Sequence, residues 1–80
     1  MAETDEDKID GVLFGILIKK LRIERDMGSI ELAILAFDDE SKHTRISEYE
    51  NGKVKSPRAK TLEPICLALD IEIEKLPVLL

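Results

Sequence analysis

The sequence has few of the residues on which several classes of protein depend. It contains one cysteine, one tyrosine, two phenylalanines and no tryptophan among 80 residues. A single cysteine excludes an internal disulfide framework and leaves too few sulfur ligands for a structural zinc site. No apolar run approaches the ~20 residues that a membrane-spanning helix requires, and the acidic start is unlike a signal peptide. These absences predict a soluble, cytoplasmic chain without a membrane partner.

The length favours one small domain. Eighty residues suffice for one hydrophobic core, but such a chain is usually too short for the deep pocket of an enzyme. Hydrophobic residues make up 44% of the sequence, which is too many for a disordered chain. No Ser/His/acid or Cys/His arrangement has a supporting signature of nucleophilic catalysis. We therefore expect a globular protein that is not an enzyme, with no catalytic residue and no cofactor.

Charge is distributed unevenly along the sequence. The formal net charge is −5, from 17 acidic and 12 basic residues. This acidity argues at first against a nucleic-acid partner, because lysine and arginine drive binding to phosphates. Residues 41–60 nevertheless hold six bases against two acids, a net charge of +4, whereas residues 1–10 have a net charge of −4. The asymmetry is typical of an electrostatic binding site, although a solvated surface gives the same pattern.

Apolar residues recur with helical spacing along most of the sequence. Capping and stop signals divide it into five short helices. The first runs from a capping box at residues 4–7 to about Asp26, and the second from a Ser29 cap to about Phe37. The third is expected over residues 42–51 after a Ser41 cap, the fourth over 62–69 after a Thr61 cap, and the fifth around 73–76. The sequence thus predicts a compact all-α domain over residues 9–77, between an acidic extension (1–8) and an apolar tail (78–80).

Several short motifs are similar to those of one family of DNA-binding domains. They are Leu32-Ala33, the run ISEYENGK that ends at Lys53, then Pro57 and Thr61-Leu62. In this order they resemble the Cro/lambda-repressor-like (XRE) helix-turn-helix family over about residues 14–76. The resemblance implies a five-helix lambda-repressor-like fold, in which the second helix of the helix-turn-helix lies in the major groove. It also implies sequence-specific binding to double-stranded DNA, usually as a homodimer.

The resemblance assigns the residues expected to contact DNA. The second helix of the helix-turn-helix, here called the reading helix, is the one expected over residues 42–51. Its first turn holds Lys42, His43, Thr44 and Arg45. The positions of His43, Thr44 and Glu48 face base edges in the family. Lysine and arginine suit guanine, threonine donates or accepts, and glutamate accepts from cytosine. Phosphate contacts are expected from Ser29, Asn51, the Gly52 amide, Lys53, Lys55 and Arg58. The alternative for each lysine and arginine is a solvated surface charge.

Two further assignments from the resemblance are structural. Arg22 and Glu50 match family positions that pair between the first and third helices, so this ion pair is expected to hold the reading helix. Cys66 matches a position that the family fills with a small buried residue, which favours an inert core thiol over a nucleophile. His43 has no second ligand spaced beside it, so we expect no metal site.

The sequence departs from the family pattern at three places. The connection between Leu32-Ala33 and Ile46 is three residues longer than usual and has acids at residues 38–40 instead of the turn glycine. Since three residues make nearly one helical turn, either the second helix lengthens or the turn becomes a loop. The glutamine that commonly follows the capping serine is missing, so its phosphate contact is lost or left to Ser29. Hydrophobic residues occupy usually polar positions at Ile16, Leu17, Ile23 and Leu67.

The third departure predicts a second interface. Ile9, Val12, Ile16 and Ile23 can form an apolar stripe apart from the core-facing one, and the tail adds Leu79 and Leu80. A helix that is apolar on two faces usually has a second partner. We expect this surface to form a homodimer. The alternative is that the two ends of the chain fold back over the stripe.

These features together favour a small DNA-binding transcriptional regulator that is repressor-like and acts as a homodimer. The competing interpretation is a protein-interaction module, antitoxin-like or an adaptor, on the same fold. In that case the apolar stripe binds a protein partner, and DNA binding is secondary or absent.

Overall fold

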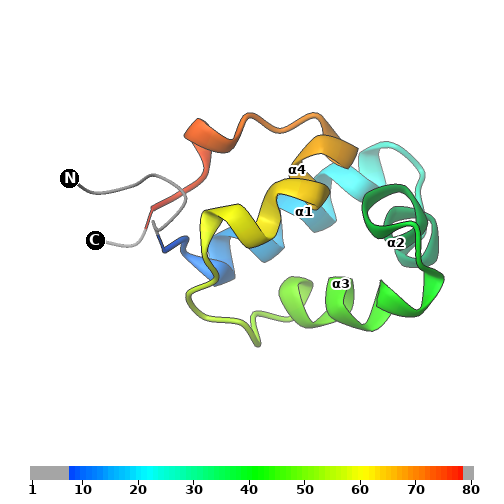
Figure 1. Ribbon diagram of the computed structural model, residues 1–80, viewed down its shortest axis with the longest axis horizontal. Helices are drawn as coiled ribbons and strands as arrows, with labels where there is room; N and C mark the ends of the chain where they lie inside the picture. Colours follow the sequence, from blue (N-terminus) through cyan, green and yellow to red (C-terminus); the bar gives the residue numbers. More distant parts are fainter. Residues whose placement is uncertain (1–7, 79–80) are drawn as a thin grey trace.

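The computed structural model of the protein describes residues 8–78, and four α-helices form its framework. They are α1 (Gly11–Glu24), α2 (Ser29–Phe37), α3 (His43–Glu50) and α4 (Glu63–Leu69). Single 3-10 turns lie before α3 and α4 and after α4: η2 (Glu40–Lys42), η3 (Ala59–Leu62) and η4 (Ile73–Lys75). Figure 1 shows α3 along one side of the molecule, α2 at one end, and α4 in front of α1 in the middle of the view. The described residues contain no named strand, so the predicted all-α class is confirmed.

The predicted fifth helix is the 3-10 turn η4, so the five-helix count is not confirmed. Leu76, which ends this turn, has an extended backbone with φ −68° and ψ 146°. It precedes Pro77, and the ring of a proline disfavours α-helical backbone in the preceding residue. Asp70 ends α4 in the left-handed conformation with φ 61°. The stretch between these two residues is too short for a regular α-helix.

The first helix begins at Gly11, later than the sequence predicted. Its cap is Asp10, whose Oδ1 accepts hydrogen bonds from the backbone N–H groups of Val12 at 3.1 Å and Leu13 at 3.2 Å. The predicted capping box at residues 4–7 lies outside the described residues. Ile9 and Gly11 instead donate their N–H groups to the carbonyl oxygens of Pro57 at 2.8 Å and Lys55 at 2.9 Å. These two hydrogen bonds join the start of α1 and the segment before it to residues 55–57.

The three predicted serine and threonine caps do not cap their helices. Ser29 is the first residue of α2, and the N–H of Gly28 before it donates to Glu31 Oε1 at 2.8 Å. Ser41 lies inside η2 and Thr61 inside η3. Consequently α3 and α4 each begin one residue later than predicted, at His43 and Glu63.

The core lies between the four helices and takes residues from all of them. Phe14 of α1 packs edge-on against Tyr49 of α3, with ring centroids 5.7 Å apart and an interplanar angle of 89°. Each large aliphatic side chain buried in such a core contributes roughly 1.5–3 kcal/mol. The fully buried large side chains are Ile9, Phe14, Ile18, Leu32, Ile46, Leu62, Ile65 and Leu69.

Two glycines of α1 allow an unusually close approach of backbones. A Cβ atom at Gly15 would overlap the carbonyl oxygen of Tyr49, and one at Gly11 would overlap that of Val54. Both glycines are buried. The helix backbone therefore lies directly against the end of α3 and against the loop that follows it, which fixes both relative to the core.

Candidate nucleic-acid interface

α3 presents a polar face to solvent and an apolar face to the core. Ile46 and Tyr49 are buried, whereas Thr44, Arg45 and Glu48 are exposed. Burial raises the pKa of the Tyr49 hydroxyl, and the neighbouring Arg45 acts in the opposite direction. Lys42 and His43, at the start of the helix, are half-buried. Of the five side chains predicted to read bases, the structure thus fully exposes three.

The long connection between α2 and α3 forms a compact turn and does not lengthen α2. Asp38 ends α2 in the left-handed conformation with φ 56°. Asp39 then caps η2, because its Oδ1 accepts from the Ser41 N–H at 3.0 Å and from the Ser41 hydroxyl at 2.7 Å. These hydrogen bonds hold the pKa of Asp39 below its usual value. A carboxylate that is ionised at neutral pH therefore lies one turn before the reading helix.

Arg22 and Glu50 connect α1 to α3 through two hydrogen bonds. Arg22 Nε donates to Glu50 Oε2 at 2.8 Å and Nη2 donates to Oε1 at 3.0 Å. Nη1 donates to the Met27 carbonyl oxygen at 2.9 Å. The side chains are only 15% and 8% exposed, and the hydrogen bond with Glu50 raises the pKa of Arg22. The pair expected from the sequence is present, and its planar geometry restricts the orientation of α3.

The C-terminus of α3 turns sharply into the basic loop, residues 53–58, which connects α3 to η3. Gly52 adopts φ 71°, which only glycine reaches without strain. Its N–H donates to the Tyr49 carbonyl oxygen at 3.1 Å, and the Lys53 N–H donates to the Glu48 carbonyl oxygen at 3.0 Å. The turn leaves Asn51, Lys53, Lys55 and Arg58 exposed. The Gly52 amide, predicted to meet a phosphate, is buried and already bonded within this turn.

A comparison with protein families agrees with this arrangement. A family model described as a Cro/C1-type HTH DNA-binding domain matches residues 18–78. The chain belongs to this Cro/C1-type family. The resemblance inferred from the motifs is thereby confirmed, and α2, α3 and α4 all lie within the matched residues. No curated protein and no solved structure matches the chain.

Lys8 lies before the matched residues and beside the basic loop, a position that the sequence did not point to. Its backbone forms an isolated antiparallel bridge with Arg58 of the basic loop, and its side chain is exposed. In the sequence, Lys8 directly follows the acidic residues of the N-terminal extension. No sequence signal could have found it, because the contact joins segments about fifty residues apart.

The apolar stripe predicted on the first helix is partly corrected. Val12, Ile16 and Ile23 are exposed on α1. Ile9 is only 1% exposed and belongs to the core, because the segment before α1 is hydrogen-bonded between the basic loop and the C-terminal segment. It therefore cannot contribute to an interface of the folded domain. Leu79 and Leu80 lie outside the described residues.

The remaining hydrophobic and titratable groups offer no reactive site among residues 8–78. Cys66 is buried in the core, and burial raises the pKa of its thiol to about 11. At neutral pH such a thiol is almost entirely protonated and therefore a poor nucleophile. Over the same range, no three His, Cys, Asp or Glu side chains are grouped to hold a metal ion. None of the helices described is long and apolar enough to cross a membrane.

Proposed function

We propose that this protein is a sequence-specific DNA-binding transcriptional regulator that represses by occupying its site, and that it acts as a homodimer. The observation that carries the proposal is the exposed polar face of α3 beside the basic loop. The Arg22–Glu50 pair and the close approach at Gly15 hold this face in place. A helix fixed in this way can enter the major groove with little loss of conformational freedom.

We infer that bases and phosphates are contacted by different parts of this surface. Thr44 and Glu48 lie one turn apart on the exposed face of α3, where they can reach base edges. Arg45 lies one turn before the buried Tyr49, so we assign it to the border of the reading face. Lys42 and His43 flank the reading face at the start of α3. The phosphate contacts that we assign are Ser29, Asn51, Lys53, Lys55 and Arg58, with Lys8 added and with Gly52 shaping the turn.

Self-association is supported by the exposed side chains on α1. Val12, Ile16 and Ile23 are each more than 40% exposed. They lie on the side of α1 that faces away from Phe14 and Ile18. A second copy of the chain would remove this apolar surface from water.

A protein-interaction module remains the second candidate. The observation that favours it is the exposure of apolar side chains on the helix-turn-helix itself: Ile30, Ile34 and Leu35 of α2. Those positions would bind a partner protein if DNA binding were secondary.

The proposal predicts different effects for base-reading and phosphate-binding residues. Replacing Lys53 and Lys55 by alanine should weaken binding to all duplex sequences similarly and reduce the salt slope, log K against log salt, by about 2. Replacing Thr44 or Glu48 by alanine should instead change the preference among sites selected from a random library. The expected loss of discrimination is about 1–3 kcal/mol at one base pair.

Fluorescence anisotropy across a salt series measures the affinity and the salt slope. The same measurement on a selected site and on its single-base-pair variants gives the discrimination. Lys75→Ala is the matched control, because Lys75 is exposed, pairs with Glu72 at 3.2 Å and lies beyond α4. It should leave affinity and salt slope unchanged. Absence of binding to any duplex at low salt would favour the interaction module over the regulator.

A further inference from the structure

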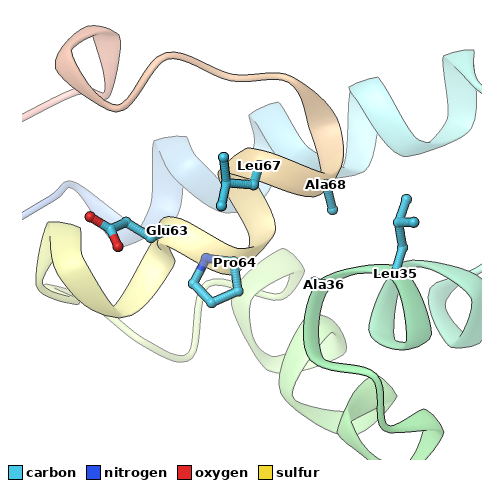
Figure 2. Close-up of a pocket in the computed structure, with 6 residues that line it drawn as sticks. All are labelled: Leu35, Ala36, Glu63, Pro64, Leu67 and Ala68. Atoms are coloured by element: carbon cyan, nitrogen blue, oxygen red, sulfur yellow. The ribbon is translucent and has the colours of Figure 1, made fainter.

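A shallow apolar groove lies between α2 and α4, away from the reading helix. Leu35 and Ala36 line it from α2, and Glu63, Pro64, Leu67 and Ala68 line it from α4 (Figure 2). Leu67 is 82% exposed and Leu35 is 59% exposed. The smaller Ala36 and Ala68 are half-buried, which leaves an open volume of about 500 Å³. The shape and chemistry suit the apolar face of a helix.

The charged residues that line this region are acidic. A second hollow shares Leu35 with the groove and is lined by Met27, Glu31, Ile34 and Asp38. The charged side chains lining the two hollows are Glu31, Asp38 and Glu63. The occupant should therefore carry apolar side chains flanked by positive charge.

The exposed face of α1 has this composition. Ile16 and Ile23, both nearly 60% exposed, lie two turns apart. Lys19 and Lys20 lie between them and are also exposed. Spacings of three and four residues place all four side chains on one side of the helix. Two such α1 faces placed together would bring four lysines close to one another.

We propose that α1 of one copy occupies the α2–α4 groove of a second copy, a head-to-tail contact that rests on the self-association proposed above. Apolar side chains then pack against apolar side chains. Lys19 and Lys20 approach the acidic rim, which consists of Glu31, Asp38 and Glu63. The contact joins two different surfaces, so each bound copy still offers a free groove or a free α1 face. The homodimer proposed above is therefore the first assembly that this contact forms, and further copies can add to its free surfaces.

The reading helix stays accessible in this assembly. The residues that line the groove belong to α2 and α4 and not to α3. Successive copies in a head-to-tail contact are related by one repeated rotation and translation and not by a two-fold axis. The contact therefore does not impose the inverted repeats that a two-fold dimer requires of its DNA site.

Sedimentation velocity of the full chain without DNA tests the contact separately from DNA binding. The wild type should form species of two or more chains at micromolar to millimolar concentration. Ile16→Glu removes the α1 face, and Leu67→Glu removes the groove. Each variant alone should be monomeric, and an equal mixture should form a dimer that grows no further, because each variant keeps the surface that the other lacks. Val78→Glu is the control for charge at an exposed apolar position and should behave as the wild type.

A charge reversal then tests the acidic rim. Adding Lys19→Glu and Lys20→Glu to the Leu67→Glu chain should weaken the mixed dimer at least tenfold, because that chain supplies α1. The same reversal in the Ile16→Glu chain should have no effect, because its α1 is not used. A wild type that is monomeric throughout would overturn the proposal. So would a mixture without dimers, or one single variant that still dimerises fully, since both indicate a different interface.

Discussion

The guanidinium group of Arg22 joins three segments of the chain. It pairs with Glu50 on α3 and also bonds the Met27 carbonyl oxygen before α2. Both side chains of the pair are mostly buried, so either one left alone would be a poorly solvated charge. At the scale of single residues, the position of α3 therefore depends on a side chain of α1 that is not part of the face that we propose to read bases.

Arg22→Lys should lower the free energy of unfolding by about 2 kcal/mol, because lysine cannot make the two parallel bonds to the carboxylate. Urea denaturation followed by circular dichroism measures this. Replacing both residues together, as Arg22→Met with Glu50→Leu, should cost less than the sum of the two single changes, since no charge is left unpaired. Additive losses would mean that the two side chains do not act as a pair.

Among the elements, the contact of α1 with the end of α3 sets the geometry of the DNA surface. At Gly15 the backbone of α1 lies so close to the Tyr49 carbonyl oxygen that there is no room for a methyl group. The same approach at Gly11 positions the basic loop, whose backbone is also bonded to Ile9. Packing against the core therefore fixes the position of the residues that we propose as DNA contacts.

Gly15→Ala should therefore destabilise the domain by about 3 kcal/mol, because the backbone of α1 or α3 must move to accept the new methyl group. Specific DNA affinity should fall in the same variant under conditions where it remains folded. Gly28→Ala is the matched control, since a Cβ there meets only Glu31 Oε1 at 3.7 Å. It should cost less than about 1 kcal/mol as an altered helix cap. Equal losses in the two variants would refute the role of close approach.

Over the whole molecule, the distribution of charge matters more than its sum. The net charge of −5 coexists with a basic loop because acids are concentrated elsewhere in the sequence. The backbone of Lys8 forms a bridge with Arg58, and Asp5, Glu6 and Asp7 directly precede Lys8 in the sequence. We expect them to compete with phosphates for the basic loop.

Neutralising these three acids as Asp5→Asn, Glu6→Gln and Asp7→Asn should raise the affinity for random duplex DNA several-fold at low salt. The gain should vanish near 0.5 M salt, where a Debye length of roughly 4 Å screens the charges. Neutralising Asp70, Glu72 and Glu74 instead changes the net charge equally at a position across the molecule from α3 (Figure 1). An equal gain in this control would assign the effect to total charge and not to the N-terminal acids.

Local signals in the sequence were sufficient for the helices and for much of the core. The spacing of Phe14 and Ile18, and of Leu32 and Ala33 with Ile46, places them inside, because helical periodicity needs no knowledge of distant contacts. The third helix ends within one residue of its predicted end, because the turn at Gly52 is also local. Helix starts were less accurate, because 3-10 turns and Asp10 supply the caps that serine and threonine were expected to provide.

The sequence by itself determined the all-α class, the family and the identity of the basic segment, because each depends on residue types and short spacings. Only the tertiary structure decided that Ile9 is core, that Lys8 lies beside Arg58, and that Leu35 and Leu67 border one groove. These facts depend on which segments meet after folding. The hydrophobicity of a side chain favours its removal from water. Whether that side chain is buried inside the same domain or left exposed depends on how the other helices pack around it.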